Sequence, residues 1–171
     1  MPDAVRALVG FGALVLVCAA VLAVTAAATR DEIDANRHRQ FAETLSALVG
    51  RAVSPTDLVW VAGRAGLCGG GTLLRGEAAG YAGAIRWLAA ADGQPPALRR
   101  VHIIGHQETP GIADFLDRPD DGWLGGLHGL DAAALAAVDT VSGATITSRA
   151  LRRDLAAALV APVPAAGDCA S

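Results

Sequence analysis

Hydroxyl side chains gather in one short stretch of this 171-residue sequence, DTVSGAT, which begins at Asp139 and ends at Thr145. Gly143 allows backbone conformations that other residues rarely adopt, and Ala144 has only a small side chain. A bulky group can therefore approach the backbone closely. The stretch directly precedes an apolar helical pattern, and the free amides at the start of a helix attract anions. These features together favour the binding of a phosphate group.

Two interpretations of this stretch stay open from residue types alone. Its hydroxyls can instead cap the first amides of the helix, a role open to Ser142, Thr145, Thr147 and Ser148. The stretch lacks the lysine of a P-loop, the three spaced glycines of a dinucleotide fold and the G-x-S-x-G of a serine hydrolase. The residues therefore indicate either a capped helix or an anion-binding helix start.

A second candidate segment, GHQETPGIADF, runs from Gly105 to Phe115 and follows a predicted strand. Its Thr109-Pro110-Gly111 sequence is typical of a tight turn, because proline presets one φ angle and glycine supplies the positive φ of the next residue. From residue types alone, the segment is either a plain turn with an incidental acid at Glu108 or one wall of a site.

The two segments together resemble the FMN-binding domain of the RnfG/RsxG subunit of Rnf electron-transport complexes and of the related NqrC subunit of sodium-pumping quinone reductase. DTVSGAT fills the family's flavin-attachment pattern, Dxx(S/T)GA(T/S). GHQETPGIADF is similar to the family's H-x-E-T-P-G-(L/I)-G, with Ala113 in place of the last glycine. GYAGAI, which begins at Gly80, resembles a hairpin of the same family.

The resemblance implies that FMN is attached through a phosphoester bond to Thr145, the last residue of DTVSGAT. Other cofactor-binding residues implied around the attachment point are Asp139, Ser142, Gly143, Ala144 and Thr147. The ETPG turn is implied to wall the isoalloxazine ring, and Glu108 to tune its electronics; the residues concerned are His106, Glu108, Thr109, Pro110 and Gly111. We expect no catalytic residue and no metal ligand.

The resemblance also implies a function: a membrane-anchored electron carrier of an Rnf-type complex that couples ferredoxin/NAD electron transfer to ion translocation, without independent catalytic activity. The implied partners are the other membrane subunits, membrane lipid, and a separate flavin transferase that uses FAD and magnesium. Two alternatives stay open, namely a flavinylated extracytoplasmic domain of another transmembrane redox or sensory system, and a non-redox anchored scaffold.

The first thirty residues predict a membrane anchor. The run from Ala7 to Thr29 contains no charged residue, and it is long enough to cross a hydrocarbon core of about 30 Å at ~1.5 Å per residue. A cleavable signal peptide is the alternative, but its apolar core usually has only about 7 to 15 residues. We expect a single-pass anchor in the bacterial inner membrane over residues 1–29, with the C-terminal domain on the periplasmic side.

The rest of the chain predicts an α+β fold, with antiparallel strands and flanking helices. Residues 30–50 predict a polar stalk that becomes an amphipathic helix, residues 51–161 the FMN-binding domain, and residues 162–171 a flexible tail. Gly50 is expected to end the amphipathic helix. Within the domain, the patterns predict a strand at 57–63 and a hairpin of two strands at 82–90 and 98–106. They also predict a helix at 131–139 with Asp131 as its N-cap, and a helix at 146–160 with Ile146 on its apolar side.

Composition argues against two classes of partner. The 14 basic residues, all arginine, are outnumbered by 17 acidic ones, which disfavours nucleic-acid binding. The three cysteines lack the paired spacing of zinc or iron-sulfur sites. Cys68 and Cys169 are candidates for a disulfide if the domain lies outside the cytoplasm.

Overall fold

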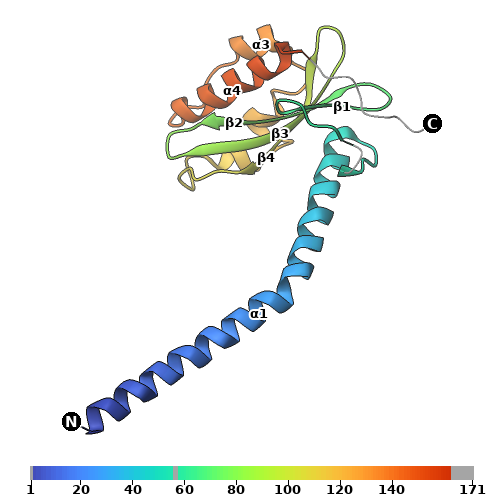
Figure 1. Ribbon diagram of the computed structural model, residues 1–171. Helices are drawn as coiled ribbons and strands as arrows, with labels where there is room; N and C mark the ends of the chain where they lie inside the picture. Colours follow the sequence, from blue (N-terminus) through green and yellow to red (C-terminus); the bar gives the residue numbers. More distant parts are fainter. Residues whose placement is uncertain (1, 56–57, 163–171) are drawn as a thin grey trace. The chain divides into compact units, whose positions relative to one another are not determined.

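The chain divides into two compact units, Met1–Phe41 and Ala42–Ser171. The computed structural model describes residues 2–55 and 58–162 (Figure 1). Cys169 lies outside the described residues, as does the predicted tail beyond Pro162, so the pairing with Cys68 stays a prediction.

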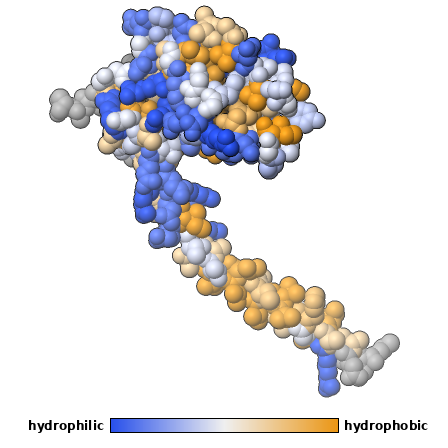
Figure 2. Space-filling view, turned by 180° about the vertical axis from the view of Figure 1, so that it is seen from behind, coloured by the Kyte–Doolittle hydropathy of each residue, from blue (hydrophilic) through white to orange (hydrophobic). Residues whose placement is uncertain are grey.

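Helix α1 extends from Pro2 to Val49 and begins in the first unit. Figure 2 shows hydrophobic side chains along its N-terminal half and hydrophilic side chains toward its C-terminal half. No side chain in its most apolar 18-residue window is buried. By length and composition, this helix is able to cross a membrane.

The last turns of α1 belong to the second unit, where Leu45, Leu48 and Val49 are buried. The helix ends at the predicted residue, because Gly50 has a φ of +74° and its amide donates to the Ser46 carbonyl at 2.8 Å. A positive φ just past the last helical residue is the usual role of glycine at a helix C-terminus.

Four antiparallel strands form one sheet in the order β1-β2-β3-β4. Their bounds are Arg64–Gly66 for β1, Thr72–Ala79 for β2, Ala84–Asp92 for β3 and Ala97–Gly105 for β4. The hairpin predicted from the patterns at 82–90 and 98–106 is confirmed as β3 and β4. Strand β2 was not predicted, because its two internal charges, its glycine and its alanines hide the strand pattern.

The strand predicted at 57–63 is wrong in its described part. Residues 58–60 have no regular structure, and Val61 forms only an isolated bridge with Arg64. The chain reverses at Ala62 and Gly63, which both have positive φ. Trp60 of this segment lies under the Arg75 guanidinium, whose central carbon is 4.5 Å from the ring centroid. The aromatic and β-branched residues thus belong to a surface segment that precedes the sheet.

The main core lies on one face of the sheet, around Trp87. The indole Nε1 of this residue donates to Asp154 Oδ2 at 2.7 Å, which ties β3 to the last helix. Gly76 is the cross-strand partner of Trp87, and a Cβ at Gly76 would lie 2.4 Å from the indole. Close packing of the indole therefore requires a glycine opposite it.

Helices cover this face of the sheet, and α3 and α4 lie side by side on it (Figure 1). The helices after the sheet are η2 (Asp114–Asp117), α2 (Gly122–Gly125), α3 (Ala132–Ala137) and α4 (Thr145–Val160). The helices predicted at 131–139 and 146–160 are confirmed as α3 and α4. Asp131 caps α3 as its residue type predicts, since its carboxylate accepts from the Ala134 amide at 2.8 Å.

Candidate functional site

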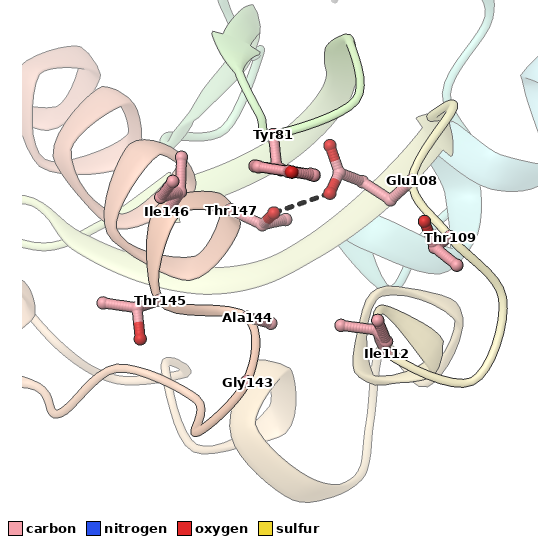
Figure 3. A pocket seen from close by; sticks show the side chains of 9 residues that line it. All are labelled: Tyr81, Glu108, Thr109, Ile112, Gly143, Ala144, Thr145, Ile146 and Thr147. Atoms are coloured by element: carbon pink, nitrogen blue, oxygen red, sulfur yellow. Dashed lines mark hydrogen bonds between the residues drawn. The ribbon is translucent and has the colours of Figure 1, made fainter.

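A cavity of about 410 Å³ lies at the start of α4 (Figure 3). Three segments form its walls: the turn between β2 and β3, the ETPG turn after β4, and the loop that leads into α4. The lining residues are Tyr81, Glu108, Thr109, Ile112, Gly143, Ala144, Thr145, Ile146 and Thr147. This volume is in the range of small-molecule sites, about 300 to 1,000 Å³.

The start of α4 has no side-chain cap. Ala144 is the N-cap residue, and among the described residues no side chain accepts a hydrogen bond from the first-turn amides. The interpretation of the DTVSGAT hydroxyls as helix caps is therefore wrong. Gly143 has a φ of +80°, with open space where a Cβ would lie, so the backbone before the helix is open to a ligand.

Two threonines of the first turn of α4 line the cavity, but their hydroxyls differ. Thr147 is buried with 2% exposure, and its Oγ1 donates to Glu108 Oε2 at 2.6 Å. Thr145 is half-buried, and no described side chain holds its hydroxyl. In Figure 3, the Thr147 hydroxyl points toward Glu108, whereas the Thr145 side chain lies apart from that pair. Of the two hydroxyls, the one at Thr145 makes no hydrogen bond among the described residues.

Glu108 joins two walls of the cavity. Its carboxylate is buried, and Oε1 accepts from the Ala82 amide at 2.9 Å while Oε2 accepts from Thr147. A Cβ at Gly80 would lie 2.3 Å from Oε1, so only glycine leaves room for the carboxylate at this turn. A buried carboxylate needs hydrogen-bond donors. Here the donors come from the β2–β3 turn and from α4, so Glu108 holds these two segments together.

His106 binds the backbone of Glu108 and does not line the cavity. Its Nδ1 accepts from the Glu108 amide at 3.2 Å, and its Nε2 lies 3.3 Å from Asp117 Oδ1. Because Nδ1 is an acceptor, the ring hydrogen of the neutral form is on Nε2, where it faces the Asp117 carboxylate. The imidazole therefore connects the ETPG turn to η2.

The ETPG turn contributes Glu108 and Thr109 to the cavity, and Ile112, which follows the turn, also lines it. Pro110 and Gly111 are exposed and outside the cavity. Gly111 has the positive φ that the sequence predicts, +85°. Its amide donates to Asp114 Oδ1 at 2.6 Å. Proline and glycine thus shape the turn, while its flanking residues face the cavity.

Asp139 and Ser142 also lie outside the cavity lining, although both belong to DTVSGAT. Both are exposed, and within the described residues neither side chain has a hydrogen-bond partner. The Asp139 carbonyl, in contrast, accepts from Trp123 Nε1 at 2.7 Å. The structure thus brings six of the eleven expected site residues to the cavity: Thr145, Gly143, Ala144, Thr147, Glu108 and Thr109.

Three apolar residues of the cavity were not among the predicted site residues. Tyr81, Ile112 and Ile146 are exposed by 75%, 54% and 55%, and each comes from a different wall. Helical spacing predicted Ile146 on the packed side of α4. That prediction is wrong, because buried positions on α4 begin only at Thr147. Tyr81 lies in the GYAGAI segment, so its place in a family hairpin was the available sign.

Within residues 2–55 and 58–162, no group of three or more His, Cys, Asp or Glu side chains is arranged to hold a metal ion. The cavity is lined mostly by apolar, small and hydroxyl side chains, with Glu108 as its only ionisable carboxylate among the lining residues. A mostly apolar lining with a few polar groups is typical of sites for organic ligands.

Part of the chain is similar to known proteins. Residues 80–160 match the FMN-binding domain. The chain is similar to the G subunit of the ion-translocating oxidoreductase complex of Haemophilus influenzae (strain PittEE), with 37% identity over 83 residues that cover 42% of this chain and 40% of the relative. The same protein of Pseudomonas aeruginosa (strain UCBPP-PA14) is 32% identical over 94 residues, 47% of this chain and 42% of the relative. The chain thus spans about two fifths of the length of these curated relatives, and the resemblance to RnfG-type subunits is confirmed.

Proposed function

Because residues 80–160 match the FMN-binding domain, we propose that this chain binds FMN in the cavity at the start of α4 and carries it covalently on Thr145. One observation carries the proposal: the cavity brings an unengaged threonine hydroxyl, an uncapped helix start and three exposed apolar side chains to the same place. A flavin mononucleotide has a phosphate and a flat ring that need those surroundings.

The phosphate end of the ligand fits the entry to α4. First-turn amides of a helix satisfy anionic oxygens, and the helix dipole adds to the attraction. Gly143 leaves the backbone uncovered there, since a Cβ at this position would meet open space. An ester at Thr145 Oγ1 places the phosphate beside these amides.

The ring end of the ligand fits the apolar rim. Tyr81 from the β2–β3 turn, Ile112 next to the ETPG turn and Ile146 from α4 lie on three sides of the cavity (Figure 3). Exposed large apolar residues that surround one cavity mark a binding surface. Burial against a flat ring removes their surface from water, which stabilises the complex.

The attachment is a phosphoryl transfer that a separate enzyme catalyses. Oγ1 of Thr145 forms a bond to the phosphorus of the FMN half of FAD, the pyrophosphate bond breaks, AMP leaves, and the hydroxyl proton is released. We assign this step to a magnesium-dependent flavin transferase. Thr147 is not the acceptor, because its hydroxyl is buried and donates to Glu108. The attached FMN supplies electron transfer, and the chain holds and shields it.

We also propose a role for the whole chain. The chain is an RnfG-like subunit of an ion-translocating oxidoreductase complex, as its relatives are named, and it relays electrons between ferredoxin and NAD with other membrane subunits as partners. Residues 1–29 anchor it in lipid of a bacterial inner membrane, residues 30–50 form a stalk, and the FMN-binding domain is periplasmic. The length and apolar character of α1 support the anchor.

The test is co-expression of the full chain with a flavin transferase, followed by denaturing electrophoresis under ultraviolet light and by intact mass. We expect a fluorescent band and one added FMN in the wild-type chain and in T140V, a control in the same loop. T145V is expected to lose both. Fluorescence in T145V would move the acceptor elsewhere, and a colourless wild-type chain would favour the scaffold alternative.

A further inference from the structure

The loop that carries the acceptor sequence, residues 138–144, is held by side chains from outside DTVSGAT. We propose that Trp123, Ser148 and Arg152 are positioning residues, which keep this acceptor loop in the shape that flavin attachment requires. The inference rests on the proposed attachment at Thr145. It assigns roles to three residues that neither the attachment pattern nor the cavity lining includes.

Trp123 holds the start of the acceptor loop from α2. Its indole Nε1 donates to the Asp139 carbonyl at 2.7 Å. The indole meets Phe115 edge to face, with the ring centroids 5.4 Å apart and the planes at 85°. Packing on Phe115 fixes the plane of the indole, so its single donor is aimed at the loop.

Ser148 holds the middle and the end of the acceptor loop from α4. Its hydroxyl is fully buried, accepts from the Val141 amide at 3.1 Å and donates to the Ala144 carbonyl at 2.9 Å. The Ala144 amide also donates to the Val141 carbonyl at 3.0 Å, which closes a turn. Removal of the hydroxyl would leave the Val141 amide without its partner.

Arg152 lies one helical turn beyond Ser148 on α4 and holds the residue before DTVSGAT. Its Nη1 donates to the Val138 carbonyl, where α3 ends. Its Nε is buried without a hydrogen-bond partner in the part of the chain that the structure describes. The guanidinium thus lies against the loop, with one of its donors committed to the loop backbone.

All three side chains bind backbone atoms, so the shape of the acceptor loop does not depend on the loop's own polar side chains. The side chains of Asp139 and Ser142 are exposed and make no hydrogen bond among the described residues. They are therefore accessible to another protein. A loop that already has its bound shape loses less conformational entropy when an enzyme binds it. The acceptor hydroxyl at Thr145 follows directly after this ordered loop, which aligns it for transfer.

The test measures the initial rate of flavin attachment to the purified full chain in detergent, with FAD, Mg²⁺ and a flavin transferase. W123F is the deciding variant, because phenylalanine keeps an aromatic ring against Phe115 and removes the N–H donor. S148A removes the hydroxyl, and S148T restores it. W60F is the matched control, since Trp60 is far from the acceptor loop in sequence and packs on Arg75.

We expect attachment at least ten times slower in W123F and in S148A, a wild-type rate in W60F, and partial recovery in S148T. The thermal unfolding temperature of W123F should stay at the wild-type value, because the hydrogen bond that this variant loses is exposed to solvent. S148A should unfold at a lower temperature, since the Val141 amide loses its acceptor, and this amide should exchange with deuterium faster. Wild-type rates in both W123F and S148A would overturn the inference. So would slow attachment in W123F together with a lowered unfolding temperature of that variant, because that result means a role in global stability. Absence of attachment to the wild-type chain would instead refute the proposed function.

Discussion

At the residue scale, two threonines two positions apart on α4 have different chemistry because their hydroxyls meet different surroundings. Thr147 donates to a buried carboxylate, while Thr145 opens onto the cavity. Six of the site residues that the sequence pattern predicts line the cavity. The pattern did not predict which hydroxyl is engaged, because that depends on Glu108, thirty-nine positions away in the chain. It also missed Tyr81, which only the turn between two strands brings to the cavity.

Replacement of Glu108 tests how the two cavity walls are joined. Glu108→Ala leaves the Ala82 amide and the Thr147 hydroxyl without their acceptor. We expect the free energy of unfolding to fall by about 1 to 3 kcal/mol, the usual cost of an unsatisfied buried group. Glu108→Gln is the matched variant, because an amide can accept from Ala82 and donate to the threonine oxygen, which is free to rotate.

Urea denaturation of the full chain in detergent, without flavin, measures both Glu108 variants. We expect the unfolding midpoint of Glu108→Gln to lie closer to that of the wild-type chain than the midpoint of Glu108→Ala does. Equal stability of the alanine variant and the wild-type chain would show that the carboxylate does not hold the two segments together.

At the element scale, the predictions succeeded where local pattern and packing agree. The β3–β4 hairpin, the Asp131 cap of α3 and the end of α1 at Gly50 all follow from short-range chemistry. The strand predicted at 57–63 failed because aromatic and β-branched residues there form a surface segment. Strand β2 was missed because its glycine serves the packing of a tryptophan on the next strand.

Gly76 of β2 therefore gives a test of the sheet core. A methyl group at this position would lie 2.4 Å from the Trp87 indole and 3.0 Å from Asp154 Oδ2. Gly76→Ala must displace the indole from its hydrogen bond with Asp154, and we expect a loss of about 1 to 3 kcal/mol, as for other overpacked cores. Glu77→Ala, an exposed neighbour on the same strand, is the control and should stay near the wild type. Equal unfolding midpoints for the two variants would contradict the packing described for Trp87.

At the scale of the whole molecule, the sequence predicted an apolar N-terminal helix followed by an α+β domain, and both are confirmed. Membrane insertion and the side on which the domain lies depend on partners and machinery outside the chain. The relatives are also matched over only about two fifths of their length. Electron donors and acceptors therefore belong to the proposal.

The stability of the folded domain should depend on pH through His128. Burial lowers the pKa of His128 below its ordinary value of 6.5, with Asp120 opposing and Arg100 reinforcing the shift. The folded chain therefore binds this proton less readily than the unfolded chain, and stability contributed by the neutral imidazole is lost as the pH falls below 6.5. His128→Gln cannot be protonated, so its unfolding temperature should fall less than that of the wild type between neutral pH and mildly acidic pH. Parallel falls in the two proteins would contradict this assignment.

The most direct test of the central claim is to locate the flavin on the chain. Cleavage before aspartate residues releases the peptide Asp139–Arg153, which contains five hydroxyl side chains: Thr140, Ser142, Thr145, Thr147 and Ser148. Fragmentation of this peptide from flavin-loaded wild-type protein should place the whole added mass of one FMN on Thr145. The added mass on Thr147, or on any residue outside this peptide, would contradict the account.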